Sequence, residues 1–189
     1  IKNPNNSEIH SKINDLFLNH TPIEKYKIKG KTIFVKREDL FCSDKIAPLS
    51  KMRGVQRVME GLKKDRVKTV GVFDFKVSKA GVGISAMAKH LGMHCIECYQ
   101  HYKSYDETGL PKQQQQCIEW GAELFPIKAS RININYAIGK KYVTSLGGYM
   151  FPKGIILDET INATSAEVEY DQESIKSFKN IVISVGSGT

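Results

Sequence analysis

Hydrophobic residues follow two spacing patterns, one typical of helices and one typical of strands, and the two patterns take turns along the chain. Apolar residues recur at spacings of three and four in one set of segments, which predicts helices at 51–59, 84–91, 112–120, 132–145 and 164–170. Short apolar or alternating runs predict strands at 31–36, 69–75, 94–99, 123–127 and 180–185. Residues 1–20 are expected to form a short amphipathic segment. Because strands and helices alternate, the fold class is predicted to be α/β, with parallel sheets flanked by helices.

Three glycine-bearing segments lie at or beside the ends of these predicted elements, at 50–54, 78–83 and 186–189. Parallel sheets bind ligands beyond the carboxyl ends of their strands, so these segments are candidate site loops. The last of them follows the predicted strand 180–185 directly. A glycine turn after a buried strand normally leads into a helix whose N-terminus holds an anion. We therefore expect the C-terminal part of the fold to be missing, because the chain is a fragment or is completed by another chain.

Composition points to a folded protein of ordinary type. The 189 residues are 41% hydrophobic and 25% charged, which allows a sizeable core and argues against disorder. No apolar run approaches the roughly 18–20 residues of a membrane helix, and the first residues lack the apolar stretch of a signal peptide. The sequence therefore predicts a cytoplasmic protein without a membrane partner.

The cysteines do not suggest a metal site or a disulfide scaffold. Cys95 and Cys98 have the spacing of a metal-binding pair, but the segment around them reads as a strand, in which positions three apart face opposite sides. No second pair or well-spaced histidine completes a zinc site. We expect ordinary strand packing and no metal.

The formal net charge of +8 favours anionic partners. The basic residues are dispersed, however, and no basic motif interleaved with aromatic residues appears. A solvated basic surface is the preferred interpretation, while the charge leaves a nucleic-acid partner open.

Five motifs in a fixed order resemble those of the fold-type-II pyridoxal-phosphate (PLP) enzymes. This superfamily contains tryptophan synthase β, threonine dehydratase and aminocyclopropane-carboxylate deaminase. The motifs are Thr21-Pro22, Lys36-Arg37-Glu38-Asp39, Ser50-Lys51-Met52-Arg53-Gly54, Ala88-Lys89-His90-Leu91-Gly92 and Gly186-Ser187-Gly188-Thr189. The resemblance covers essentially the whole chain and implies PLP as the cofactor, a small amino acid as the substrate and a homodimer.

The resemblance also implies a role for each candidate site residue. Lys51 is expected to carry the Schiff base to the cofactor and, once released, to move the α-proton of the substrate. The phosphate is expected to bind the terminal turn, because glycines allow close backbone approach and hydroxyls add donors; the residues are Gly186, Ser187, Gly188 and Thr189.

The loop at Ser78 departs from the family pattern. Relatives usually carry an asparagine that contacts the phenolic oxygen of the cofactor, and counting back from Leu91-Gly92 puts Lys79 at that position. Ser78 is retained, and Ala80 stands where relatives have a histidine. The Lys79 cation could pair with a phenolate or with a substrate carboxylate. It could equally mean that the usual polarisation of the ring is absent.

These features leave three functional readings open. The leading one is a PLP-dependent lyase or deaminase that performs β-elimination or deamination on a small amino acid. The second is a divergent PLP-binding protein without turnover, and the third is a PLP enzyme acting on an amino acid or amine linked to nucleic acid. The expected domains are 1–75 as the start of the large cofactor domain, 76–150 as a smaller α/β domain, and 151–189 as the return to the large domain.

Overall fold

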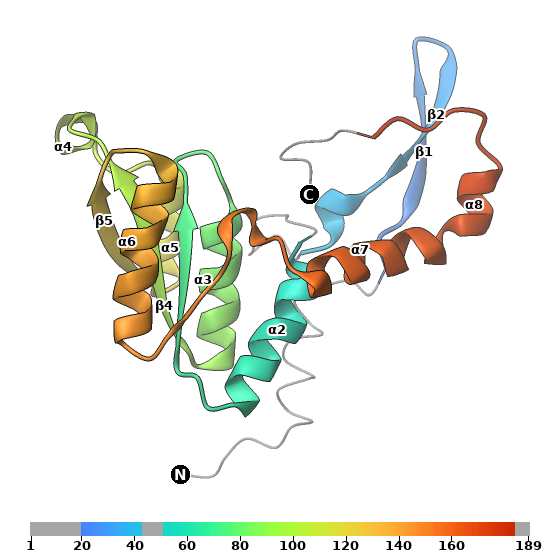
Figure 1. Ribbon diagram of the computed structural model, residues 1–189. Coiled ribbons are helices and arrows are strands. Elements are labelled where there is room, and N and C mark those ends of the chain that lie inside the picture. The colour runs from blue at the N-terminus through green and yellow to red at the C-terminus, as the bar shows by residue number, and fades with distance from the viewer. Residues whose placement is uncertain (1–19, 43–50, 184–189) are drawn as a thin grey trace. The chain divides into compact units, whose positions relative to one another are not determined.

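The computed structural model describes residues 20–42 and 51–183, and Figure 1 shows the course of the chain. The chain divides into two compact units, Ile1–Ser50 and Lys51–Thr189. The domain limits expected at 75/76 and 150/151 stay predictions. Within the described residues, no helix has the length and apolar content needed to cross a bilayer.

The first unit is built on an antiparallel hairpin. Strand β1 (Ile23–Ile28) pairs with β2 (Lys31–Lys36), and the 3-10 turn η1 (Glu38–Leu40) follows. Lys29 and Gly30 form the connection with φ values of 49° and 76°, as a two-residue turn between twisted strands requires. Strand β2 was predicted correctly from the sequence, whereas β1 was not predicted, because its alternating lysines resemble a solvated surface.

The second unit contains a four-stranded parallel sheet in the order β5-β4-β3-β6. The strands are β3 (Thr69–Asp74), β4 (His94–His101), β5 (Glu123–Lys128) and β6 (Tyr149–Met150). Its helices are α2 (Met52–Lys64), α3 (Ala80–Leu91), α4 (Ser104–Thr108), α5 (Lys112–Glu119), α6 (Ile132–Ser145), α7 (Asp158–Tyr170) and α8 (Gln172–Lys176), with the 3-10 turn η2 at Lys153–Ile155. The predicted α/β class with a parallel sheet flanked by helices is confirmed.

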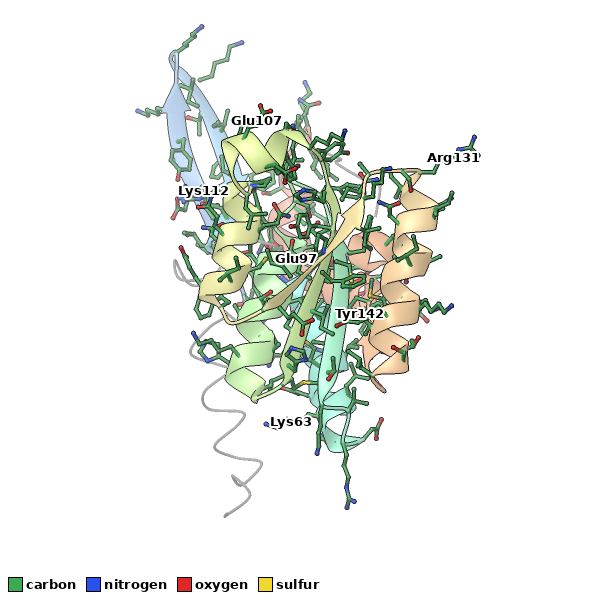
Figure 2. All side chains as sticks on the ribbon, turned by 90° about the vertical axis from the view of Figure 1, so that its left-hand side faces the viewer. Lys63, Glu97, Glu107, Lys112, Arg131 and Tyr142 are labelled. Atoms are coloured by element: carbon green, nitrogen blue, oxygen red, sulfur yellow. The ribbon has the colours of Figure 1, made fainter. Side chains whose placement is uncertain are left out.

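Helices cover both faces of this sheet. Figure 2 shows α6 on one side of the strands and α3 with α5 on the other. The core under α6 is an apolar cluster in which Val143 of α6 packs against Phe73, Ile96, Cys98, Ile127 and Met150 of the strands. Because successive residues of a strand face opposite sides, Cys95 and Glu97 of β4 face α3 and α5. Cys95 and Cys98, the pair with metal-binding spacing, both lie in β4 as predicted and are buried.

Three predicted elements need correction. The segment 78–83 is not wholly a loop, because α3 begins at Ala80. The helix predicted at 164–170 begins earlier, at Asp158, and corresponds to α7. The predicted strand 180–185 is wrong over its described residues, 180–183. A strand needs a neighbour for its backbone hydrogen bonds, and within the described chain none pairs with this segment. Its apolar side chains are therefore exposed, with Val182 at 95%.

Candidate active site

Lys51 is the first residue of the second unit and directly precedes α2. Its side chain is half-buried, and Nζ donates a hydrogen bond to the carbonyl oxygen of Gly154, 2.6 Å away. Partial burial lowers the pKa of the Lys51 ammonium, because a charged group is disfavoured away from water. The lowered pKa increases the fraction of neutral amine, the form that attacks a carbonyl carbon.

The carbonyl that contacts Lys51 is held by an unusual stretch of backbone. Gly154 has φ 70° and Ile155 has φ 54°, so the chain passes through two left-handed residues in succession. Thr160 fixes the far side of this stretch, with its hydroxyl 3.0 Å from the carbonyl oxygen of Ile155 and 2.8 Å from that of Leu157. Ile155 itself is 1% exposed. The acceptor for the Lys51 amine is therefore part of a well-anchored turn.

The residues after Lys51 in its motif bind α2 to α7. A Cβ atom on Gly54 would lie 2.4 Å from backbone atoms of Glu159 and Thr160, so only glycine allows the two helices to approach this closely. The neighbouring Arg53 forms a buried ion pair with Glu167 of α7, with 3.3 Å between Nη1 and Oε2. The Arg-Gly part of the motif thus positions α7 beside the lysine.

A cavity of about 370 Å³ lies where Lys51 meets α7. Its wall includes polar groups of Thr160, Thr164 and Ser165 as well as the apolar side chains of Ile161 and Val168. A lysine amine, several hydroxyl groups and apolar surface therefore meet in one small space, a combination that occurs in small-molecule sites.

The second candidate loop connects β3 to α3. Asp74, at the end of β3, accepts hydrogen bonds from the backbone N–H of Phe75 at 2.9 Å and of Gly81 at 2.5 Å. Ser78 Oγ accepts one from the N–H of Ala80 at 3.2 Å. Lys79 is the N-cap residue of α3, and its side chain is exposed. Ser78 therefore shapes the loop, while Lys79 is available to a ligand.

The two candidate loops belong to helices that pack on each other. Met52, the residue after Lys51, lies against α3, where a Cβ atom on Gly83 would come within 2.8 Å of the Met52 sulfur. The structure thus brings the first turns of α2 and α3 together. The four residues expected to bind phosphate, Gly186 to Thr189, lie outside the described residues, and the roles expected for Lys51, Ser78 and Lys79 stay predictions.

A buried acidic group behind this loop was not predicted from the sequence. Glu97, in the middle of β4, is fully buried and accepts a hydrogen bond from Gln114 Nε2 at 2.9 Å (Figure 2). Burial raises the pKa of Glu97 to about 7, an effect that contacts with Cys117 and Gln114 oppose and that the nearby Asp74 carboxyl reinforces. A charged residue inside an apolar strand was the signal that could have revealed it.

The site thus combines a parallel sheet covered on both faces, a lysine at the start of one helix and a serine-containing loop before the next. The chain has the fold of the fold-type-II pyridoxal-phosphate enzymes, as the motifs predicted.

Comparison with known proteins supports this classification. The chain is 33% identical over 178 residues to a glycyl-dTMP PLP-dependent decarboxylase of Pseudomonas phage M6, covering 92% of this chain and 63% of the relative. Maize serine racemase matches with a TM-score of 0.64 and 16% identity, over 90% of this chain and 50% of the racemase. Diaminopropionate ammonia lyase of Escherichia coli matches with a TM-score of 0.61 and 10% identity, over 93% of this chain and 53% of the lyase. No family model matches the sequence.

The chain spans less than two thirds of the curated relative and about half of these two solved structures. The activity and the substrate of the whole protein are therefore matters for proposal.

Proposed function

We propose that this chain supplies the reactive lysine of a PLP-dependent enzyme that decarboxylates an amino acid joined to a nucleotide. The observation that carries the proposal is the Lys51 amine, which has a lowered pKa and lines a cavity at the start of α2. The similarity to a glycyl-dTMP PLP-dependent decarboxylase supports both the cofactor and the type of substrate.

The described residues near Lys51 suit PLP. The cofactor carries an aldehyde, which reacts with a neutral amine, and the pKa of Lys51 is lowered in that direction. The cavity of about 370 Å³ is lined by the Ser165 hydroxyl and by the hydroxyl oxygens of Thr160 and Thr164, whose own protons are donated to backbone carbonyls. When bound, PLP supplies an electron sink for the electron pair released at the substrate α-carbon.

The three described candidate residues, Lys51, Ser78 and Lys79, then have different tasks. Lys51 would hold the cofactor through its amine, and the same amine, once released, would donate the proton that the α-carbon takes up when carbon dioxide leaves. Ser78 keeps the loop before α3 in place through the N–H of Ala80. The exposed Lys79 cation pairs with an anionic group of the ligand, which is a carboxylate, a phenolate or a phosphate.

Decarboxylation replaces β-elimination or deamination as the preferred reaction because of the relative's activity. The +8 charge is compatible with a phosphorylated substrate. The earlier readings, β-elimination or deamination of a small amino acid and cofactor binding without turnover, stay predictions and are outcomes of the assays below.

Covalent trapping tests the role of Lys51. The full-length protein is incubated with PLP, reduced with borohydride and digested, and the labelled peptide is identified by mass spectrometry. We expect the label on Lys51, its loss in Lys51→Ala and its retention in Lys64→Ala, which removes an exposed lysine of the same helix. A label on another residue, or none, contradicts the proposal.

Product analysis tests the reaction. The loaded protein is given glycyl-dTMP, and carbon dioxide, ammonia and keto acid are measured together. Release of carbon dioxide alone is expected. Ammonia with a keto acid indicates the lyase or deaminase reading, and a labelled lysine without any product indicates a binding protein without turnover.

A further inference from the structure

A second cavity, of about 480 Å³, lies at the carboxyl end of β4. The loop after β3 forms one wall through Phe75 and Val77, and α4 forms another through Tyr105. The end of β4 contributes Tyr99, and Gln114 of α5 closes the base. None of these residues has a task in the function proposed above. The carboxyl edge of a parallel sheet is nevertheless where such folds bind ligands.

Aromatic rings dominate this cavity. Tyr102 and Tyr105 lie with ring centroids 5.5 Å apart, and Tyr99 is 5% exposed. Tyr102 is held in place, because its hydroxyl donates to Gln100 Oε1 at 3.0 Å, while Gln100 Nε2 donates to the carbonyl oxygen of Ser130 at 2.6 Å. Because such rings are already held in place, a planar ligand can stack on them without an added entropy cost of immobilising the side chains.

Gln114 supplies the polar feature of the cavity. Its side chain is fully buried, and Nε2 is occupied by Glu97. Within the part of the chain that the structure describes, its Oε1 has no hydrogen-bond partner. A buried acceptor without a donor is costly, so a ligand whose binding opens the cavity to this oxygen and brings an N–H group there gains the missing hydrogen bond.

We infer that this cavity is a subsite for a pyrimidine base, an inference that rests on the proposed function. A thymine-type base is planar and carries a ring N–H between two carbonyl groups, which matches stacking rings beside an unpartnered amide oxygen. Enzymes that act on a base commonly hold it by stacking between side chains and by hydrogen bonds to its pairing edge.

The loop after β3 links this subsite to the candidate active site. Phe75 and Val77 line the cavity, and Ser78 and Lys79 follow directly after Val77, just before α3. Under the proposed function Lys79 pairs with an anionic group of the ligand, so one loop would contact the base with its first residues and that anionic group with its last. A free small amino acid has no base that could contact Phe75 and Val77.

Binding of dTMP to the full-length protein, measured by isothermal titration calorimetry, tests the subsite. Gln114→Met should weaken binding about tenfold, since it removes the acceptor, whereas Gln115→Met, at an exposed position of the same helix, should leave binding unchanged. Tyr105→Leu should weaken binding roughly tenfold through lost stacking, and Tyr105→Phe should retain it. Circular dichroism establishes that each variant is folded.

Deoxyribose 5-phosphate, which lacks the base, serves as the ligand control. Binding of dTMP no tighter than this control, or equal binding by wild type and Tyr105→Leu, overturns the subsite. Borohydride labelling of Lys51 is read in the same protein samples. A labelled Lys51 without selective dTMP binding refutes the subsite alone, and selective dTMP binding with Lys51 unlabelled supports the subsite while refuting the proposed function.

Discussion

At Gly54, the absence of a side chain sets how closely α2 and α7 approach. A methyl group there would lie 2.4 Å from the backbone of Glu159 and Thr160, which cannot move aside as a flexible side chain can. We expect Gly54→Ala to lower the free energy of unfolding by about 1–3 kcal/mol, measured by urea denaturation.

Gly61, in the same helix, is the matched control for that experiment. Nothing lies within 4 Å of a Cβ atom added there. Gly61→Ala should therefore stabilise the protein by about 0.5–1 kcal/mol, because alanine favours the helix. Equal effects of the two substitutions would mean that α2 and α7 do not pack as described.

The buried carboxyl group of Glu97 should make stability depend on pH. Its pKa is raised to about 7 by burial, while an unfolded glutamate titrates near about 4.3. The folded state therefore keeps a proton that the unfolded state loses, and stability falls as pH rises through this window. The loss is of order 3 kcal/mol by about pH 8. Burial also raises the pKa of Asp74, which acts in the same direction.

Urea denaturation of wild type and Glu97→Gln between about pH 5 and pH 8 measures this effect. The variant should show a clearly smaller decline, because its side chain cannot ionise. Glu119→Gln, at an exposed position of α5, should behave like wild type. A decline in Glu97→Gln as steep as in wild type would assign the pH dependence to other groups.

Residues of the candidate site differed in how readily the sequence revealed them. Lys51 was located because flanking motifs single it out from the other lysines, although its role stays a prediction. Glu97 was visible as a charge within an apolar strand but was not used. Gln114 gave no signal, because it sits among four consecutive glutamines, and only the packing of α5 shows that it is the buried one.

Among the elements, the β1–β2 hairpin depends on two left-handed residues. Gly30, with φ 76°, adopts this conformation at little cost, whereas alanine does not. Gly30→Ala should therefore weaken the hairpin by about 1 kcal/mol, seen as faster amide exchange in β1 and β2. Lys29→Asn should slow exchange, because asparagine tolerates the left-handed region better than lysine. Unchanged exchange in both variants would contradict the turn geometry.

The limits of the helices were predicted unevenly. Those of α6, Ile132–Ser145, agree with the prediction, whereas α2, predicted to end at 59, continues to Lys64. The start of α3 was placed too late because Gly81 and Gly83 disfavour a helix in isolation. In the fold they are required, as the Asp74 carboxylate and Met52 occupy the space beside them. Periodicity alone could not show which neighbours allow those glycines.

At the scale of the whole molecule, the parallel sheet was predictable from the alternation of elements, whereas the order β5-β4-β3-β6 was not. Strand order depends on contacts between distant segments, which a single sequence does not display. The same limit explains the error at 180–183, where an apolar pattern was taken as a strand without knowledge of a neighbour.

The net charge of the whole chain predicts how binding to nucleic acid should depend on salt. If the substrate is part of a nucleic acid, the +8 chain should bind oligothymidylate with an affinity that falls as salt rises. Two phosphate contacts correspond to a log–log slope of about −1.4 for a single strand. Fluorescence anisotropy across a salt series measures it, with an uncharged methylphosphonate oligomer as control. A slope near zero would indicate a free nucleotide as the substrate.

The contact between Lys51 and the carbonyl of Gly154 has a kinetic consequence. The two residues are 103 positions apart in sequence, and the hydrogen bond sets where the amine stands when it meets an aldehyde, while the lone pair that reacts is not used in donating it. The rate of reaction therefore depends partly on the turn at η2 and not on the lysine alone. Substitutions that reshape this turn should alter how quickly Lys51 is labelled while leaving the final extent of labelling the same.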